Sequence, residues 1–198
     1  MLLNKSKLIF FISLISGWLF AQPITNIDVC YKLINQSVAS VDSVYSQMKE
    51  KPAVEISVPA ALDQLRTNII TAFQDKGYNV TQSQNIPSIY FIINNSLIKY
   101  EEPFTKGLFG DAYVQRKINL TGSYFLTEKQ NTSTPKSFYF EYSDTVSMDS
   151  IRDLESKNLA FTQANIPPAP VLSNLMEPII VVGTLITTII LLFTIRSK

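Results

Sequence analysis

The chain has 198 residues, with 17 basic and 16 acidic side chains, a single cysteine and no histidine. Four of the basic residues lie in the two ends and all of the acidic ones lie between, so the part between the ends carries a net charge of −3. This balance excludes a nucleic-acid-binding protein, which needs a clustered positive surface, and the missing histidine excludes Ser-His-Asp and Cys-His nucleophiles and the usual zinc sites.

The opening 21 residues have the three parts of a secretory signal. Two lysines precede an apolar run over residues 8–20, and Ala21 supplies a small residue at its exit. The run is shorter than the 17–25 or so residues that a bilayer span needs. We predict a signal peptide over residues 1–21, cleaved after Ala21. An uncleaved anchor is the alternative, because Leu19 is larger than the residue preferred at that position.

The exported part, residues 22–155, is expected to begin with a helix, a strand and a second helix. Apolar residues recur every three or four positions over 27–48, which predicts a one-faced helix. A short strand is expected at 53–58, between two prolines. The clearest helix lies within 61–77 and stops at Gly77, the residue type that commonly follows a helix end.

After Gly77 the apolar period changes from helical to alternating. We expect a short strand at 78–81, a long central strand at 88–100 that is apolar on both faces, and two alternating strands at 113–129 and 137–146. These elements predict an α+β fold with a mostly antiparallel sheet of about four to five strands and two helices packed on one face. The expected core residues are Leu65, Ile69, Phe73, Ile118, Leu120 and Tyr124.

Two segments are expected between this domain and the closing stretch. Residues 147–156 predict a short helix capped by Ser150. Residues 156–177 contain three prolines near their middle, and proline-rich chain favours an extended, semi-rigid conformation. We predict a stalk over 156–177.

The closing stretch from Pro178 to Ile195 carries no charge and predicts a transmembrane helix, about 27 Å long at 1.5 Å per residue. Its four threonines can each donate to a carbonyl one turn back. Cations in the tail, residues 196–198, favour its cytoplasmic side. We therefore predict a single-pass protein of the cytoplasmic membrane, with its main domain on the periplasmic or extracytoplasmic side. A removable lipid-anchor signal is the alternative, although such a signal normally ends in apolar residues.

The polar residues indicate no catalytic, metal or cofactor site. Gly107 and Gly110 precede no helix or lysine signature of a phosphate-binding loop, and the adjacent Glu101 and Glu102 point to opposite faces if they lie on a strand. Cys30 is expected to be a buried small residue. We predict a protein that is not an enzyme. An acidic stretch that fits no calcium loop is interpreted as solvated surface: Asp144, Asp149, Asp153 and Glu155.

The loop between the strands at 88–100 and 113–129 contains more apolar residues than turn chemistry calls for. One interpretation is that its apolar side chains fold back and cap the end of the core. The other is that its tip anchors a partner protein, since interfaces concentrate aromatic residues within a polar rim. The residues of this second hypothesis are Phe104, Lys106, Leu108, Phe109 and Asp111.

The order of elements from Ala53 to Val146 resembles a module of bacterial envelope proteins. In that module a helix ends in Gly-aromatic-x-Val, here residues 77–80, and a following strand often opens Ala-Asp-Tyr, where this chain has Ser-Ile-Tyr at 88–90. The module occurs in the curli-secretion lipoprotein, the outer-membrane activators of penicillin-binding proteins and the amino-terminal domain of the Tol translocation protein. The resemblance implies an envelope protein that binds other proteins or cell-wall material, and it carries over no catalytic residue.

We therefore expect a non-enzymatic, membrane-anchored envelope protein that acts as a binding or assembly module for other envelope components. The alternative is an envelope sensor or regulator that relays a state through its transmembrane helix to a membrane partner. A tail of three residues holds no signalling domain, which favours the first function.

Overall fold

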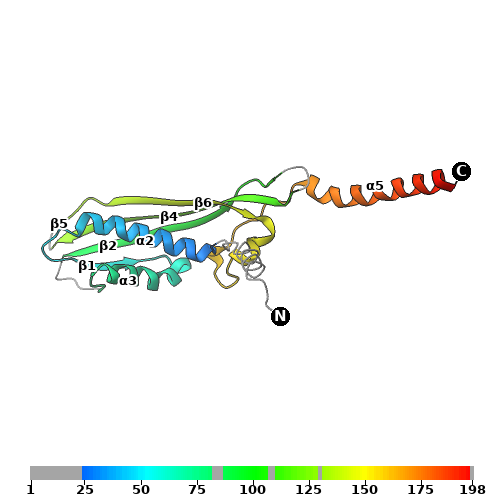
Figure 1. Ribbon diagram of the computed structural model, residues 1–198. Coiled ribbons are helices and arrows are strands. Elements are labelled where there is room, and N and C mark those ends of the chain that lie inside the picture. The colour runs from blue at the N-terminus through cyan, green and yellow to red at the C-terminus, as the bar shows by residue number, and fades with distance from the viewer. Residues whose placement is uncertain (1–23, 82–86, 107–109, 129–130, 197–198) are drawn as a thin grey trace, which may run out of the picture.

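The computed structural model describes residues 24–81, 87–106, 110–128 and 131–196, and within these it has four α-helices and a six-stranded sheet. Two helices, α2 and α3, pack on one face of the sheet, and a third, α5, extends away from the body (Figure 1). The predicted signal peptide lies outside the described residues.

Helix α2 (Asn26–Tyr45) has a clear start and one apolar face. The hydroxyl of Thr25 accepts a hydrogen bond from the backbone N–H of Asp28, which satisfies a donor that has no partner within the helix. The negative carboxylate of Asp28 in the first turn also interacts favourably with the positive end of the helix dipole. The buried face contacts β4 and β6 and consists of Val29, Cys30, Leu33, Ile34, Val38 and Val41.

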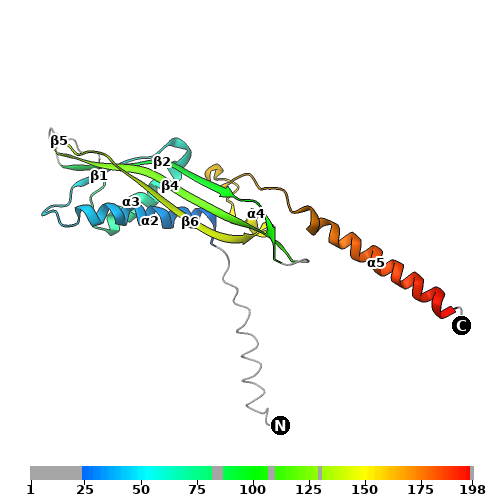
Figure 2. The same cartoon turned by 90° about the horizontal axis from the view of Figure 1, so that it is seen from above.

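The sheet is built on three long strands. β2 (Ser88–Tyr100) pairs with β4 (Ala112–Glu128), which pairs on its other side with β6 (Lys136–Ser147). β4 is antiparallel to both of these neighbours. The two-residue strands β3 (Phe104–Thr105) and β5 (Asn131–Thr132) pair with the two ends of β4. β1 (Ala53–Ser57) lies beside the first five residues of β2 (Figure 2).

The prediction of a mostly antiparallel sheet of four to five strands with two helices is wrong, because the sheet is mixed and has six strands, and the described chain has four helices. β1 is parallel to β2, with Ala53 opposite Ser88 and Ser57 opposite Ile92. The chain between them returns along the sheet through the 3-10 helix η2 (Ala60–Leu65) and helix α3 (Arg66–Asp75). A crossover through a helix brings two consecutive strands into parallel pairing.

The residues expected in the core are buried. Leu65, Ile69, Phe73, Ile118 and Leu120 are completely inaccessible, and Tyr124 is 5% exposed. Behind α3 the chain turns at Gly77, whose φ of 79° lies in the left-handed region that favours glycine. The expected strand at 78–81 is reduced to a single parallel bridge between Val80 and Val54.

The opposite face of the sheet carries no helix in the described chain. Its side chains alternate with those that face α2, and they include a stacked pair, Tyr90 and Phe125, with ring centroids 5.0 Å apart. Most of its other side chains are polar, with Asn119, Thr121 and Ser123 in the middle of β4. This surface is therefore half-buried and polar at its centre.

After β6 the chain packs against the domain through three short helical turns, and then continues into helix α5. The 3-10 turn η3 (Met148–Ser150) leads into the short helix α4 (Ile151–Leu154), whose Ile151 and Leu154 join the core. Ser150 precedes α4 as expected, but its hydroxyl donates to the carbonyl of Ser147 and does not cap the helix. A last turn, η4 (Ala160–Thr162), lies within the predicted stalk and buries Thr162.

Helix α5 (Val171–Arg196) includes the stretch predicted to cross a membrane. Its threonines do bond carbonyls one turn back, as Thr187 does to Gly183 at 2.8 Å and Thr188 to Thr184 at 2.8 Å. The predicted transmembrane helix at 178–195 is nevertheless wrong: across the described residues, no helix combines the length and the apolar content that a bilayer crossing requires. The prediction rested on counting uncharged residues, and this run lies at the short limit of a span and holds four threonines.

The predicted location in the cytoplasmic membrane depended on the predicted transmembrane helix. A single-pass arrangement in the cytoplasmic membrane, attached through Pro178–Ile195, requires a helix that crosses the bilayer, and none is found in the described part of the chain. That localisation is therefore wrong.

Candidate binding groove

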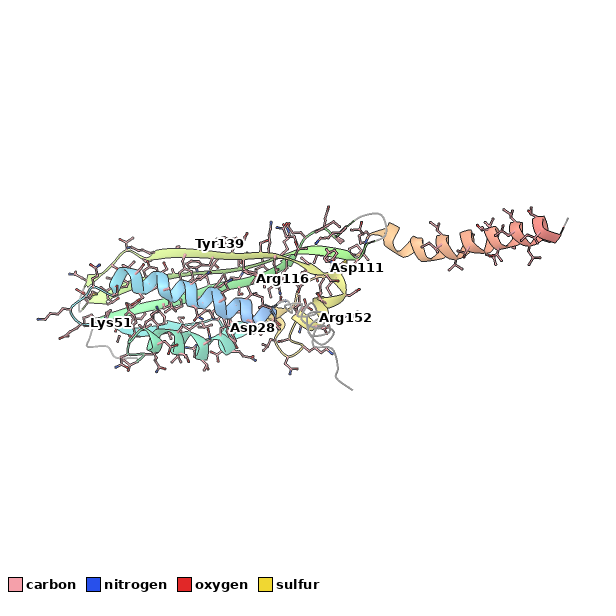
Figure 3. The ribbon with its side chains drawn as sticks, viewed as in Figure 1. Asp28, Lys51, Asp111, Arg116, Tyr139 and Arg152 are labelled. Atoms are coloured by element: carbon pink, nitrogen blue, oxygen red, sulfur yellow. The ribbon has the colours of Figure 1, made fainter. Side chains whose placement is uncertain are left out.

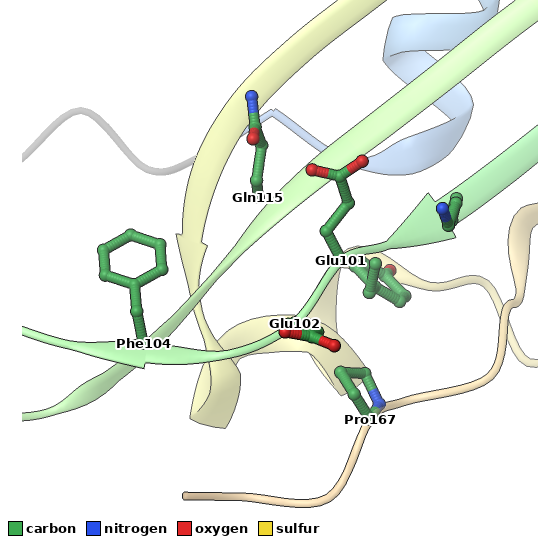
Figure 4. Close-up of a pocket in the computed structure, with 7 residues that line it drawn as sticks. Glu101, Glu102, Phe104, Gln115 and Pro167 are labelled. Carbon is green, nitrogen blue, oxygen red and sulfur yellow. The ribbon is translucent and has the colours of Figure 1, made fainter.

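Two adjoining hollows follow the end of β2 and form one groove, which we call the β2 groove. The first has a volume of about 490 Å³ and lies between the end of β2, Phe104 and Pro167 (Figure 4). The second, of about 650 Å³, lies between the same strand end and residues 163–165. Lys99 and Tyr100 line both hollows. The remaining lining residues are Leu97, Ile98, Glu101, Glu102, Gln115, Gln163, Ala164 and Asn165.

The groove exists because β2 extends beyond the end of the neighbouring strand β1. β1 covers β2 only as far as Ile92, and the described chain has no strand along the rest of that edge. The chain that returns after η4 runs beside this uncovered end of β2, but no hydrogen bond joins the two backbones within the described residues. A strand end and an extended segment with a gap between them make an open, elongated groove.

Phe104 stands on the wall of the groove with 41% of its surface exposed. It stacks on Tyr113 across the β3–β4 pair, with ring centroids 6.2 Å apart, and is not among the residues of the buried core. The amine of Lys106 lies 4.5 Å from the centre of the same Tyr113 ring, a cation–π distance. Two of the five proposed partner-binding residues, Phe104 and Lys106, therefore contact the same tyrosine ring.

The other three residues are placed differently. Asp111 is exposed directly before β4 and lines neither hollow. Leu108 and Phe109 lie outside the described residues. The five residues therefore remain a hypothesis, with Phe104 as the member that the structure places in the groove.

Two neighbouring carboxylates and Lys99 give the groove its charge pattern. Glu101 accepts a hydrogen bond from Lys117 at 2.7 Å, and this bond holds the pKa of the Glu101 carboxyl below its usual value. Glu102 is exposed, and no cation contacts it among the described residues (Figure 4). One acid is thus already paired, and the other remains available to a ligand.

The inner wall is held by a buried polar network. Asn26, at the start of α2, donates to the hydroxyl of Tyr100 at 2.9 Å and to the carbonyl of Thr162 at 2.8 Å. Burial raises the pKa of Tyr100 to about 12, so its hydroxyl keeps its proton in alkaline solution as well as at physiological pH. The network joins α2, the end of β2 and the returning chain, and it fixes the distance between the two sides of the groove.

Arg116 is the centre of this network (Figure 3). Its side chain is completely buried and donates from two nitrogens to both oxygens of Asp144, at 2.8 and 2.6 Å. A third nitrogen, Nη1, donates to the Asn26 side chain at 2.7 Å and to the Ile24 carbonyl at 2.9 Å. The two-pronged bond satisfies a buried guanidinium with the geometry that arginine favours.

Sequence reasoning missed this network, and one signal for it was present. Arg116 occupies an inward position of β4, between Val114 and Ile118, where the alternating pattern calls for an apolar residue. Such an arginine needs a buried partner. The partner is Asp144, and the interpretation of Asp144 as solvated surface is therefore wrong, whereas Asp149 and Asp153 are exposed as expected.

Other polar side chains offer little reactive chemistry. Cys30 is buried as expected, with its sulfur 3.6 Å from the hydroxyl of Ser96, and burial raises the pKa of its thiol. Across the described residues, no three cysteine or acidic side chains gather as they would to hold a metal ion. Within the described residues, we take the β2 groove as the candidate binding site.

Comparison with known structures gives twelve remote likenesses, two of which are described below. No family model and no curated protein matches the chain. The fold is similar to a minor lipoprotein from Acinetobacter baumannii, with 13% identity and a TM-score of 0.35 over 64% of this chain and 86% of that one. It is also similar to rare lipoprotein B from Shewanella oneidensis, with 10% identity and a TM-score of 0.28 over 49% of this chain and 70% of that one. Both neighbours are bacterial lipoproteins, but values this low support no argument about function.

Proposed function

We propose that this protein is a non-enzymatic binding or assembly module of the bacterial cell envelope, and that the β2 groove holds its partner. The signal-peptide pattern of residues 1–21 supports export. The resemblance of residues 53–146 to a module of envelope proteins supports the location and the binding role. The alternative of a sensor depended on relay through a transmembrane helix and is not retained.

The observation that carries the proposal is the exposure of Phe104 at the wall of a groove. An aromatic side chain that only capped the core would be buried against it, whereas Phe104 is 41% exposed and lies outside the core cluster. Glu102 and Gln115 line the same hollow, and Lys106 lies over the Tyr113 ring on which Phe104 stacks, so polar side chains supply a rim. An exposed aromatic anchor within polar neighbours is the composition of a protein interface.

The charges of the groove indicate the chemistry of the partner. Glu102, which has no ion-pair partner in the described part of the chain, lines the same hollow as Phe104 (Figure 4). A polypeptide that places an apolar side chain on Phe104 and a lysine or arginine on Glu102 would match both groups. The function proposed is therefore recognition of an envelope protein through an apolar and a basic residue.

The test uses the full chain and a matched control. Val44 is an equally exposed apolar residue, at 42%, and lies in the last turn of α2, whereas the groove lies beside the first turn. Binding to envelope proteins extracted in detergent is compared for the unmodified chain, Phe104→Ser and Val44→Ser, and the melting temperature of each is measured. We expect Phe104→Ser to weaken capture of one defined partner about 10- to 100-fold while its melting temperature hardly changes. Unchanged capture by Phe104→Ser, or equal loss in Val44→Ser, would refute the proposed site.

A further inference from the structure

β6 forms one edge of the sheet along its whole length. It pairs with β4 from Lys136 to Ser147, and no strand of the described chain pairs with its other side. It lies along the rim of the body, and the labelled Tyr139 lies on it (Figure 3). This edge is on the opposite side of the sheet from the β2 groove.

The hydrogen-bonding direction of each residue in β6 follows from one bond on β4. The carbonyl of Gln115 accepts from the N–H of Glu101, so the backbone of Gln115 faces the β2 side. The next residue, Arg116, therefore faces β6, and its partner Asp144 faces β4. Alternation along β6 then directs the remaining backbone groups outward at Ser137, Tyr139, Glu141, Ser143 and Thr145.

These outward groups form an unusually open edge. Proteins normally protect an edge strand with a proline, a bulge, several charges or a covering segment. β6 contains no proline, its register with β4 is unbroken, and Glu141 is the sole charged residue among the five that face outward. Within the described chain, no backbone hydrogen bond reaches these five residues from outside the sheet.

The side chains of β6 are complementary to a second, antiparallel copy of the same strand. Pairing centred on Phe140 places Tyr139 opposite Glu141 of the second copy. Tyr139 already donates to the Glu141 carboxylate within one copy, so this contact suits both side chains. The same register places like side chains opposite each other: Phe140 with Phe140, Phe138 with Tyr142, and Ser137 with Ser143.

Charge selects this register over its neighbour. Pairing centred one residue further on, at Glu141, sets the two Glu141 carboxylates directly opposite each other, which is unfavourable for like charges on a sheet. Pairing centred on Phe140 avoids that contact, because each Glu141 then lies opposite Tyr139 of the other copy.

We propose that the protein forms a symmetric dimer in which two β6 strands pair antiparallel around Phe140, giving one continuous sheet through both copies. The interface is isologous, because each copy offers the same strand, and closed two-fold pairing covers the open edge. The two helices α2 lie on the same face of the joined sheet. The β2 grooves remain at its two outer margins, so dimer formation and partner binding are separate properties.

A proline substitution tests the pairing without removing a backbone hydrogen bond inside one copy, although it also removes the Glu141 carboxylate that accepts from Tyr139. The N–H of Glu141 faces outward, so Glu141→Pro removes a donor that only the second copy would use. Sedimentation of the full chain in mild detergent at tens-of-micromolar concentration should show a dimer for the unmodified protein and a monomer for Glu141→Pro. A monomeric unmodified protein, or a dimer that persists in a folded Glu141→Pro variant, would overturn the proposal.

Cysteine cross-linking tests the register and does not depend on the proline variant folding. In a Cys30→Ser background, Phe140→Cys places two thiols at a non-hydrogen-bonded pair, where Cα atoms lie about 4.5 Å apart and a disulfide can form. Tyr142→Cys is the matched control, since residue 142 faces 138 of the second copy. Mild oxidation should link the first variant into a dimer and leave the second largely monomeric. Equal linking of both variants, or stronger linking through position 142, contradicts the register.

Discussion

The strongest single prediction concerns the removal of the carboxylate from the buried ion pair. Asp144→Ala deletes the two carboxylate oxygens that accept from the Arg116 guanidinium at 2.8 and 2.6 Å, and leaves a positive charge in a side chain with no exposed surface. Breaking a buried pair from one side costs about 3–5 kcal/mol. The Asp144 side chain is 23% exposed and Arg116 keeps its bonds to Asn26 and Ile24, so we expect the lower end, about 3 kcal/mol.

The measurement is denaturant unfolding of the full chain followed by circular dichroism. A loss of about 3 kcal/mol is a large fraction of the 5–15 kcal/mol that folded domains usually have. The double variant Arg116→Met with Asp144→Leu removes both charges and should recover most of the loss, because apolar replacement of a buried pair is often neutral. A cost below about 1 kcal/mol for Asp144→Ala would mean that Arg116 is solvated, and would refute the reasoning.

Three further predictions follow from particular contacts. Gly122→Ala should destabilise the fold by about 1–3 kcal/mol, since an added Cβ would meet the Ile92 carbonyl oxygen and the Phe138 ring at 2.3 Å, and an unchanged melting temperature would show that β4 can shift. Lys117→Met should raise the pKa of the Glu101 carboxyl in an NMR titration; the pair stabilises the fold above the ordinary carboxyl pKa, and that contribution is lost as pH falls through the lowered value. Cys30 should resist maleimide labelling until the protein is unfolded, and labelling of the native chain at the rate of a free thiol would contradict its burial.

The elements with the strongest local pattern were predictable from the sequence. The strand at 88–100 has the predicted bounds, because its apolar run is flanked by turn residues. The helix at 26–45 begins one residue before and ends three residues before the predicted range of 27–48. In both elements, the spacing of the apolar residues along the chain determines which face is buried. That spacing can be read from a short stretch of sequence.

The features that depend on distant residues were not predictable in this way. The parallel pairing of β1 with β2 depends on the crossover between them, which the alternating pattern of each strand does not record. Arg116 finds Asp144 28 residues later, and the groove forms where residues 163–167 return beside β2. Phe104 was singled out by its unusual place in a loop, but its neighbours in the groove were not.

The central claim, that an envelope protein binds in the β2 groove, is tested most directly by cross-linking from within the groove. A photoreactive amino acid at position 104 of the full chain, with position 44 as the control, is irradiated in cells that produce the protein, and the adducts are identified by mass spectrometry. The account predicts a single dominant protein adduct at 104, absent at 44, whose cross-linked peptide contains a lysine or arginine near an apolar residue and whose yield falls in the Glu102→Lys variant. Adducts that are equal at both positions, or an adduct at 104 that Glu102→Lys leaves unchanged, would contradict it.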